Sequence, residues 1–272
     1  MPLLAAYIVP HPPLAVAEVG RGQERAISAT LAAYREVARR IAKHAPETLV
    51  FISPHSAYYA DWIYVASGDL VGDLSEFRAP ELRFTLERDQ QLSELIISCA
   101  QKEGLPAGTV ESRPRKLDHG LMVPLYFIEQ ASPQRYQGVS IGGSGLPPAT
   151  LVEFGRCIAR AIAKQDRDIV LVVSGDLSHK LTLEGPYGFD PAGPVFDETF
   201  GEIVRGGDLM PLTDIDPRLA ESAAECGLSG FTMLAGALDE AEPRFVPELL
   251  SLEGPFGVGY GVVACEVDHE RP

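Results

Sequence analysis

Five runs of apolar residues alternate with amphipathic segments along the chain. The runs lie at residues 3–10, 48–54, 135–142, 168–176 and 259–267. Several are continuous and rich in valine and isoleucine, which is typical of strands covered on both faces of a sheet. Segments 24–44, 87–104 and 148–165 repeat apolar residues at steps of three and four, which predicts helices. The alternation predicts an α/β fold with a central sheet, mostly parallel or mixed, and helices on both faces.

Two other segments bear on the organisation of the chain. Residues 216–238 also have a helical pattern, and Gly227 and Gly230 near its middle permit a break or a close approach of backbones. Residues 184–217 are rich in glycine, proline and aspartate, which predicts an irregular insertion, either a surface excursion or a lid or dimer contact. Because no repeat or linker divides the sequence, we expect one domain over residues 1–272.

The charge balance narrows the class of partner. Lysine and arginine number 23 against 38 aspartate and glutamate, a net charge of −15 that disfavours binding to nucleic acid. The densest basic stretch contains only Arg113, Arg115 and Lys116 and is typical of a solvated loop. No segment reaches the roughly 18 consecutive apolar residues of a membrane helix, so we expect no membrane association.

The cysteines do not form a recognisable framework. The four are Cys99, Cys157, Cys226 and Cys265, and no two form a CxxC pair. This spacing predicts neither a disulfide scaffold nor a zinc site made of thiolates, and a reducing cytoplasm is the expected location.

Four of the six histidines share an unusual context. His11, His55, His119 and His179 each lie at the end of a strand or in an adjoining loop, beside proline, glycine or aspartate. Three of them, His11, His55 and His179, come just after predicted strands. Ligands of open α/β sheets gather at the carboxyl ends of the strands, so these side chains are expected to converge. Neutral imidazole is the commonest metal ligand in proteins, and a metal site is therefore the leading interpretation.

A carboxylate is needed to complete the most familiar version of such a site. Two histidines and one carboxylate form the facial arrangement of non-haem Fe(II) centres, although the same set also holds zinc. The best source is segment 216–238, where Glu221 and Glu225 fall on one helical face. Both glutamates are equally compatible with a solvated surface.

The motifs together resemble a known family. "IVPHPP", "SPHS", "LDHGLMVPL", "SGDLSH" and "ECGLSGFTMLAGAL" occur in this order and span nearly the whole chain. They resemble the class III extradiol ring-cleavage dioxygenases of the LigB type. The resemblance is greatest to the branch of stand-alone homologues named after the AmmeMemoRadiSam gene grouping, which includes the Memo proteins.

The resemblance implies a role for each motif. It implies that His11 and His55 bind the metal and that Glu225 is the third ligand. Memo-like relatives have a cysteine in a "CG" step at this place, which Cys226 matches, so the third ligand is Glu225, Cys226 or neither. His119 and His179 correspond to acid/base residues, and Asp118 and Asp176 would fix their tautomers.

The implied activity is cleavage of a catechol-type ring by O₂ with Fe(II) as the cofactor. The partners would be a small aromatic substrate, O₂ and further copies of the chain in a dimer or larger assembly. Tyr58, Tyr59 and Trp62 either line the aryl pocket or serve packing. A Memo-like protein that binds zinc or copper without cleaving rings is the alternative, and a scaffold with structural histidines is a third.

Overall fold

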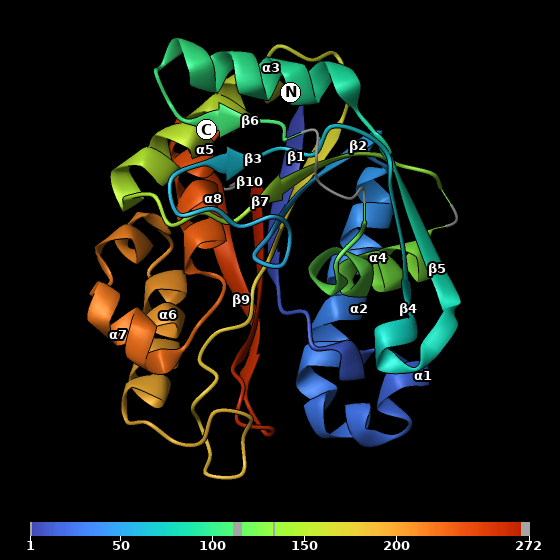
Figure 1. Ribbon diagram of the computed structural model, residues 1–272, viewed down its shortest axis with the longest axis vertical. Coiled ribbons are helices and arrows are strands. Elements are labelled where there is room, and N and C mark those ends of the chain that lie inside the picture. The colour runs from blue at the N-terminus through green and yellow to red at the C-terminus, as the bar shows by residue number, and fades with distance from the viewer. Residues whose placement is uncertain (1, 111–115, 133, 268–272) are drawn as a thin grey trace.

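A mixed eight-stranded sheet forms the centre of the computed structural model, which describes residues 2–110, 116–132 and 134–267 (Figure 1). The order across the sheet is β4-β5-β7-β2-β8-β1-β10-β9. The strands are β1 (Leu3–Val9), β2 (Thr48–Ser53), β4 (Leu70–Leu74), β5 (Ala79–Arg88), β7 (Gln137–Gly142), β8 (Ile169–Ser174), β9 (Phe245–Glu253) and β10 (Tyr260–Val267). Two short strands, β3 (Ile63–Tyr64) and β6 (Ala107–Gly108), pair separately.

The middle of the sheet is parallel and its edges are antiparallel. Strands β7, β2, β8 and β1 are parallel neighbours, and β5 joins β7 in parallel through only two residue pairs. Strands β10 and β9 extend one edge in antiparallel fashion, and β4 pairs antiparallel with β5 at the other edge. The carboxyl ends of β2, β8 and β1 therefore meet at one rim, as the sequence predicted.

Two separate hydrophobic cores cover the faces of the sheet. Along β1, Ala6 and Ile8 point into one core, whereas Ala5, Tyr7 and Val9 point into the other. This alternation follows from the two-residue period of a strand, and it requires apolar residues at every position of a strand buried on both faces.

Helices form a layer on each face (Figure 1). One layer contains α1 (Ala17–Gly20), α2 (Ser28–His44) and α4 (His119–Ala131). The other contains α3 (Gln90–Lys102), α5 (Pro148–Ile162), α6 (Ala192–Arg205), α7 (Pro217–Ala223) and α8 (Leu228–Glu240). None of these helices, which are those of the described residues, combines the length and hydrophobicity needed to cross a bilayer.

The structure confirms the α/β class and corrects several local expectations. Segment 184–217 is not wholly irregular, because α6 occupies 192–205 and buries Phe196 and Phe200 against the sheet. Segment 216–238 is two helices, since the chain turns between Ala224 and Gly227. The basic residues Arg113 and Arg115 and the tail histidine His269 lie outside the described residues.

Candidate metal centre

Three of the four histidines converge at the rim of the sheet. His11 follows β1, His55 follows β2 and His119 is the first residue of α4. One ring nitrogen from each lies within 4.8 Å of the others. The Nε2 atoms of His11 and His55 are 2.9 Å apart, and the centroid of the His119 ring is 4.0 Å from that of His55.

Contacts from the end of β8 hold His11 in place. Only 2% of His11 is exposed. Its Nδ1 lies 2.8 Å from the Ser174 hydroxyl oxygen, and its backbone N–H donates to Asp176 Oδ1 at 2.8 Å. With Nδ1 engaged by Ser174, the Nε2 atom is the one presented to the cluster. A partner on the far nitrogen that fixes ring orientation is typical of histidines that ligate metals.

A second network connects His55 with His119. The Ser53 hydroxyl donates to Asp118 Oδ1 at 2.7 Å and accepts the backbone N–H of His55 at 3.2 Å. Gly120 permits this approach of α4 to β2, because an added Cβ there would lie 2.3 Å from Ser53 Oγ. The two networks differ from the expected arrangement: Asp118 contacts Ser53 and Asp176 contacts the His11 backbone, whereas both aspartates were expected beside the rings of His119 and His179.

The turn between α7 and α8 brings a thiol to the cluster. An added Cβ on Gly175 would lie 2.5 Å from the Gly227 Cα, so the close approach of this turn to β8 depends on glycine. Cys226 Sγ consequently accepts the backbone N–H of Asp176 at 3.3 Å and lies 3.7 Å from His11 Nε2.

The two candidate glutamates lie differently. Glu225 Oε2 accepts the backbone N–H of Leu228 at 2.6 Å, at the start of α8, and burial raises the pKa of Glu225 to about 7. Glu221 is exposed on α7. Among the described residues, the group of potential ligands that all lie within 4.8 Å of one another consists of His11, His55 and His119, so it contains neither glutamate, and it does not contain Cys226 or Asp176 either. The assignment of Glu225 as a ligand stays a prediction.

His179 lies close enough to influence the cluster. Its charge is one of the causes that lower the pKa of both His11 and His55. The backbone N–H of His179 donates to the Ala223 carbonyl at 3.0 Å, and its ring meets Tyr187 edge to face at 5.5 Å. Its Nδ1 is buried and has no hydrogen-bond partner among the described residues.

The cluster favours neutral imidazoles. Burial, followed by the neighbouring histidines, holds the pKa of His11 well below its usual range. Burial is also the largest cause that lowers the pKa of His55 and of His119 to about 4. At neutral pH the ring nitrogens therefore keep the lone pairs that bind a metal.

The donor set and its charge fit a cation. Asp176 is 6% exposed, and its one ion-pair partner among the described residues is the neutral His11, at 3.9 Å. Burial raises the pKa of Asp176 to about 6, and the hydrogen bond from the His11 backbone offsets part of this effect. A bound cation would further stabilise the anionic form. Metal–donor bonds of about 2.0–2.3 Å allow donors up to about 4.5 Å apart to share one ion. His55 Nε2, Cys226 Sγ and Asp176 Oδ2 lie 2.9, 3.7 and 3.9 Å from His11 Nε2.

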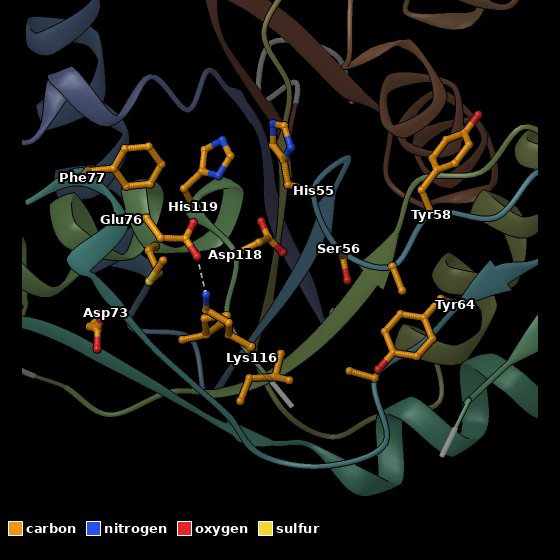
Figure 2. Close-up of a pocket in the computed structure, with 15 residues that line it drawn as sticks. His55, Ser56, Tyr58, Tyr64, Asp73, Glu76, Phe77, Lys116, Asp118 and His119 are labelled. Atoms are coloured by element: carbon orange, nitrogen blue, oxygen red, sulfur yellow. Dashed lines mark hydrogen bonds and ion pairs between the residues drawn. The ribbon is translucent and has the colours of Figure 1, made fainter. Parts of the chain in front are cut away.

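A cavity of about 580 Å³ opens beside His55 and His119 (Figure 2). Phe77, Tyr58 and Tyr64 contribute aromatic surface to its wall. Of the aromatic residues singled out in the sequence, Tyr58 lines the cavity. Trp62 instead donates its indole N–H to the Gly108 carbonyl at 3.3 Å.

Sequence reasoning missed the residues that support the histidines. Ser53 and Ser174 are the last residues of β2 and β8, and each touches a histidine or its backbone. The sequence feature that could have identified these two serines is a polar residue at the end of an apolar strand. Glu76, which also lines the cavity, gave no signal because isolated charges occur throughout the sequence, and Lys116, interpreted as part of a solvated loop, is exposed but lines the cavity as well.

Comparison with known proteins identifies relatives over almost the full chain. Residues 5–263 match the family model described as the catalytic LigB subunit of aromatic ring-opening dioxygenase. Protein CA_C1420 of Clostridium acetobutylicum is 36% identical over 98% of this chain, and the match spans 58% of that protein's own length.

More distant similarities extend the comparison. The 3,4-dihydroxyphenylacetate 2,3-dioxygenase of Escherichia coli is 23% identical over 86% of this chain and 89% of its own. The crystal structure of the uncharacterized protein JW3007 from Escherichia coli K12 has a TM-score of 0.62 and 16% identity, covering 96% of this chain and 99% of that one. At this identity, the structural match shows a shared fold.

Proposed function

We propose, from the premise that the chain belongs to the LigB family of aromatic ring-opening dioxygenase catalytic subunits, that it is a non-haem Fe(II) enzyme that cleaves a catechol-type ring with O₂. The observation that carries the proposal is the convergence of His11, His55 and His119 beside a cavity large enough for a small aromatic ligand. The activity named for the Escherichia coli relative supports a vicinal aromatic diol as the substrate class.

His11 and His55 are the proposed metal ligands. The contacts favour Cys226 as the third, because its sulfur lies 3.7 Å from His11 Nε2, whereas a carboxylate oxygen of Glu225 is occupied by the Leu228 amide. When bound there, Fe(II) would supply Lewis acidity toward the diol oxygens and reactivity toward O₂.

Two further histidines would handle protons. His179 has an unpartnered buried Nδ1 and is the proposed acceptor of a proton from a substrate hydroxyl. His119 lines the cavity beside His55, and its lowered pKa keeps it neutral. In this form His119 can donate one hydrogen bond and accept another, which suits it to orient the ring and pass on a proton.

The alternative is a Memo-like metalloprotein that does not cleave rings. The proximity of Cys226 to His11 is compatible with this alternative, since thiolate ligands suit zinc and copper. Assembly into a dimer or larger oligomer is likewise proposed from the resemblance alone and can be measured by light scattering.

Metal reconstitution tests the proposal. The protein is loaded without air in turn with Fe(II), Zn(II) and Cu(II), and then exposed to O₂ with a series of catechols. We expect only the Fe(II) form to consume one O₂ per diol with the appearance of an absorbing ring-opened product. Tight metal binding without O₂ consumption would favour the alternative, and failure to bind any metal would exclude both.

The third ligand is tested separately. Cobalt-loaded protein has a sulfur-to-cobalt absorption band if Cys226 is a ligand. Cys226→Ser should abolish this band, and Glu225→Gln should leave it unchanged. If the wild-type protein lacks this band, and if Glu225→Gln loses cobalt binding while Cys226→Ser keeps it, Glu225 is the ligand.

A further inference from the structure

Three charged side chains form one wall of the cavity, and we refer to Asp73, Glu76 and Lys116 as the charged wall. Asp73 lies in β4, Glu76 in the short 3-10 turn Ser75–Phe77, and Lys116 precedes α4. Figure 2 shows Glu76 between His119 and Lys116, with its carboxylate directed to the lysine. The charged wall thus borders the place where the proposed substrate ring would meet His119.

The lysine is already neutralised within the charged wall. Lys116 Nζ lies 2.7 Å from Glu76 Oε1, and this contact lowers the pKa of Glu76 and raises that of Lys116. Both side chains are exposed, so the pair is screened by solvent and can exchange partners with a ligand.

Asp73 leaves the charged wall with a net negative charge. Its Oδ1 accepts the backbone N–H of Ser75 at 2.9 Å, and hydrogen bonds from Ser75 lower the pKa of Asp73 so that it stays ionised. Arg83 faces Asp73 across the β4–β5 ladder and compensates part of this charge from outside the cavity lining. Among the described residues that line the cavity, Lys116 is the one lysine or arginine, against the carboxylates of Asp73, Glu76 and Asp118.

This balance acts differently on anionic and cationic ligands. A ligand carboxylate would have to share Lys116 with Glu76 and would be repelled by the nearby carboxylates of Glu76 and Asp73. A ligand ammonium could bind Asp73 or Glu76 without loss of an existing partner. The net charge of −15 on the whole chain acts in the same direction, because it attracts cations and repels anions at longer range.

We propose that the charged wall selects an aromatic diol whose side chain carries an amine, and disfavours one whose side chain carries a carboxylate. The inference rests on the proposed function, since it assigns the substrate class of the same cavity. Glu76 and Asp73 are the specificity-determining acceptors, and Lys116 reduces the negative charge that they present to a ligand.

Three ligands that differ only in the charge of a short side chain test the proposal. They are dopamine, 4-ethylcatechol and 3,4-dihydroxyphenylacetate, each titrated into anaerobic Fe(II)-loaded protein at pH 7 and low salt. An exposed charge contact changes affinity by about threefold, so we expect dopamine to bind about tenfold more tightly than the carboxylate, with the neutral ligand between them. The difference should shrink as salt is added.

Substitutions in the charged wall should change this order in different directions. Lys116→Gln leaves Glu76 without its partner and should widen the preference for the amine about threefold. Glu76→Gln frees the lysine and should remove the preference. Asp73→Asn should reduce the preference for the amine by less than Glu76→Gln does, because Arg83 already compensates part of the Asp73 charge.

A matched control lies away from the cavity. Glu240 forms an ion pair with Arg160 at 2.9 Å, and Glu240→Gln removes one carboxylate from the same kind of exposed pair. It should leave the ligand order unchanged. A change in order as large as that of Glu76→Gln would mean that only the overall charge matters and would overturn the role of the charged wall.

The outcomes separate this inference from the proposed function. Ring cleavage with no dependence of affinity on side-chain charge, or with the carboxylate bound most tightly, overturns the inference and leaves the function standing. The expected order of affinities without O₂ consumption supports the inference and removes the function. Failure of all three diols to bind overturns both.

Discussion

The two sides of the histidine cluster are built differently. On the inner side, His11 is buried and its ring and backbone are held by Ser174 and Asp176, with Cys226 close by. On the outer side, His55 and His119 border the cavity, and their neighbours include the exposed pair of Glu76 and Lys116. Both sides lie at the same rim, yet only the outer one is open to exchange of its contacts.

The difference suggests a division of labour. Rigid, desolvated contacts on the inner side preorganise donors for an ion, because fewer degrees of freedom are lost when it binds. Exposed groups on the outer side can change partners, as recognition of a substrate requires. Three predictions test whether the two sides are separate in this sense.

The largest effect is expected at His11. His11→Ala removes the donor that has potential ligand atoms of His55, Cys226 and Asp176 within 3.9 Å, and it should abolish stoichiometric metal binding. His179→Ala should retain the metal and lose turnover, since His179 is proposed to move protons. Metal content by elemental analysis, together with rate measurements, distinguishes the two.

His55→Ala extends this test of metal binding to the outer side of the cluster. It should also abolish stoichiometric binding, because His55 Nε2 lies 2.9 Å from His11 Nε2. Full metal occupancy in His11→Ala would show that the ligand assignment is wrong, whatever the activity.

A smaller effect is expected from the two serines that end neighbouring strands. Ser174→Ala removes the partner of His11 Nδ1 and should weaken metal affinity by about tenfold, the lower end of what such supporting contacts contribute. Ser53→Ala is the matched substitution at the end of β2. It removes contacts to Asp118 and to the His55 backbone but none to the His55 ring. The loss of metal affinity should therefore be smaller than in Ser174→Ala.

Competition with a chelator measures both affinities under identical conditions. Equal losses in the two serine variants would mean that the inner and outer sides contribute alike. A larger loss of metal affinity in Ser53→Ala than in Ser174→Ala would mean that the outer side of the cluster, not the inner side, contributes more to metal binding.

Continuous apolar runs made the central strands predictable. β1, β2, β7, β8 and β10 lie where such runs predicted them, because a strand buried on both faces is apolar along most of its length. The same logic could not find β5, whose residues from Pro80 to Arg83 are largely exposed, or β9, which contains a proline and charged residues. Strands at or next to the edge of the sheet, such as β9 and β5, are positioned by pairing with a neighbour, which composition records poorly.

Helix α4 shows why part of the site was missed. Nine consecutive residues from Gly120 to Ile128 are buried, so the segment has no polar face and no clear helical period. Its first residue, His119, was consequently placed in a loop near a strand end. The convergence of His11 and His55 was predictable from topology, whereas the approach of Cys226 depends on glycine contacts between distant segments.

The smallest predicted effect is a pH dependence from the outer side. The pKa of His119 is about 4 in the folded protein, mainly because of burial, against about 6.5 in an unfolded chain. Between these pH values the unfolded state binds more protons than the folded state. The free energy of unfolding that neutral His119 supports is therefore fully present above about pH 6.5 and is lost as the pH falls toward 4.

His119→Gln removes the uptake of this proton on unfolding. The metal-free variant should therefore gain about 1 kcal/mol relative to wild type between pH 7 and pH 5, after allowance for partial solvent exposure. Urea unfolding at the two pH values measures this difference. His55→Gln should gain less, because the His55 side chain is exposed although burial also lowers its pKa to about 4. A variant whose stability falls in parallel with wild type would show that His119 is already solvated and charged like a surface histidine, which would remove the electrostatic basis for assigning it to the metal-facing side of the cavity.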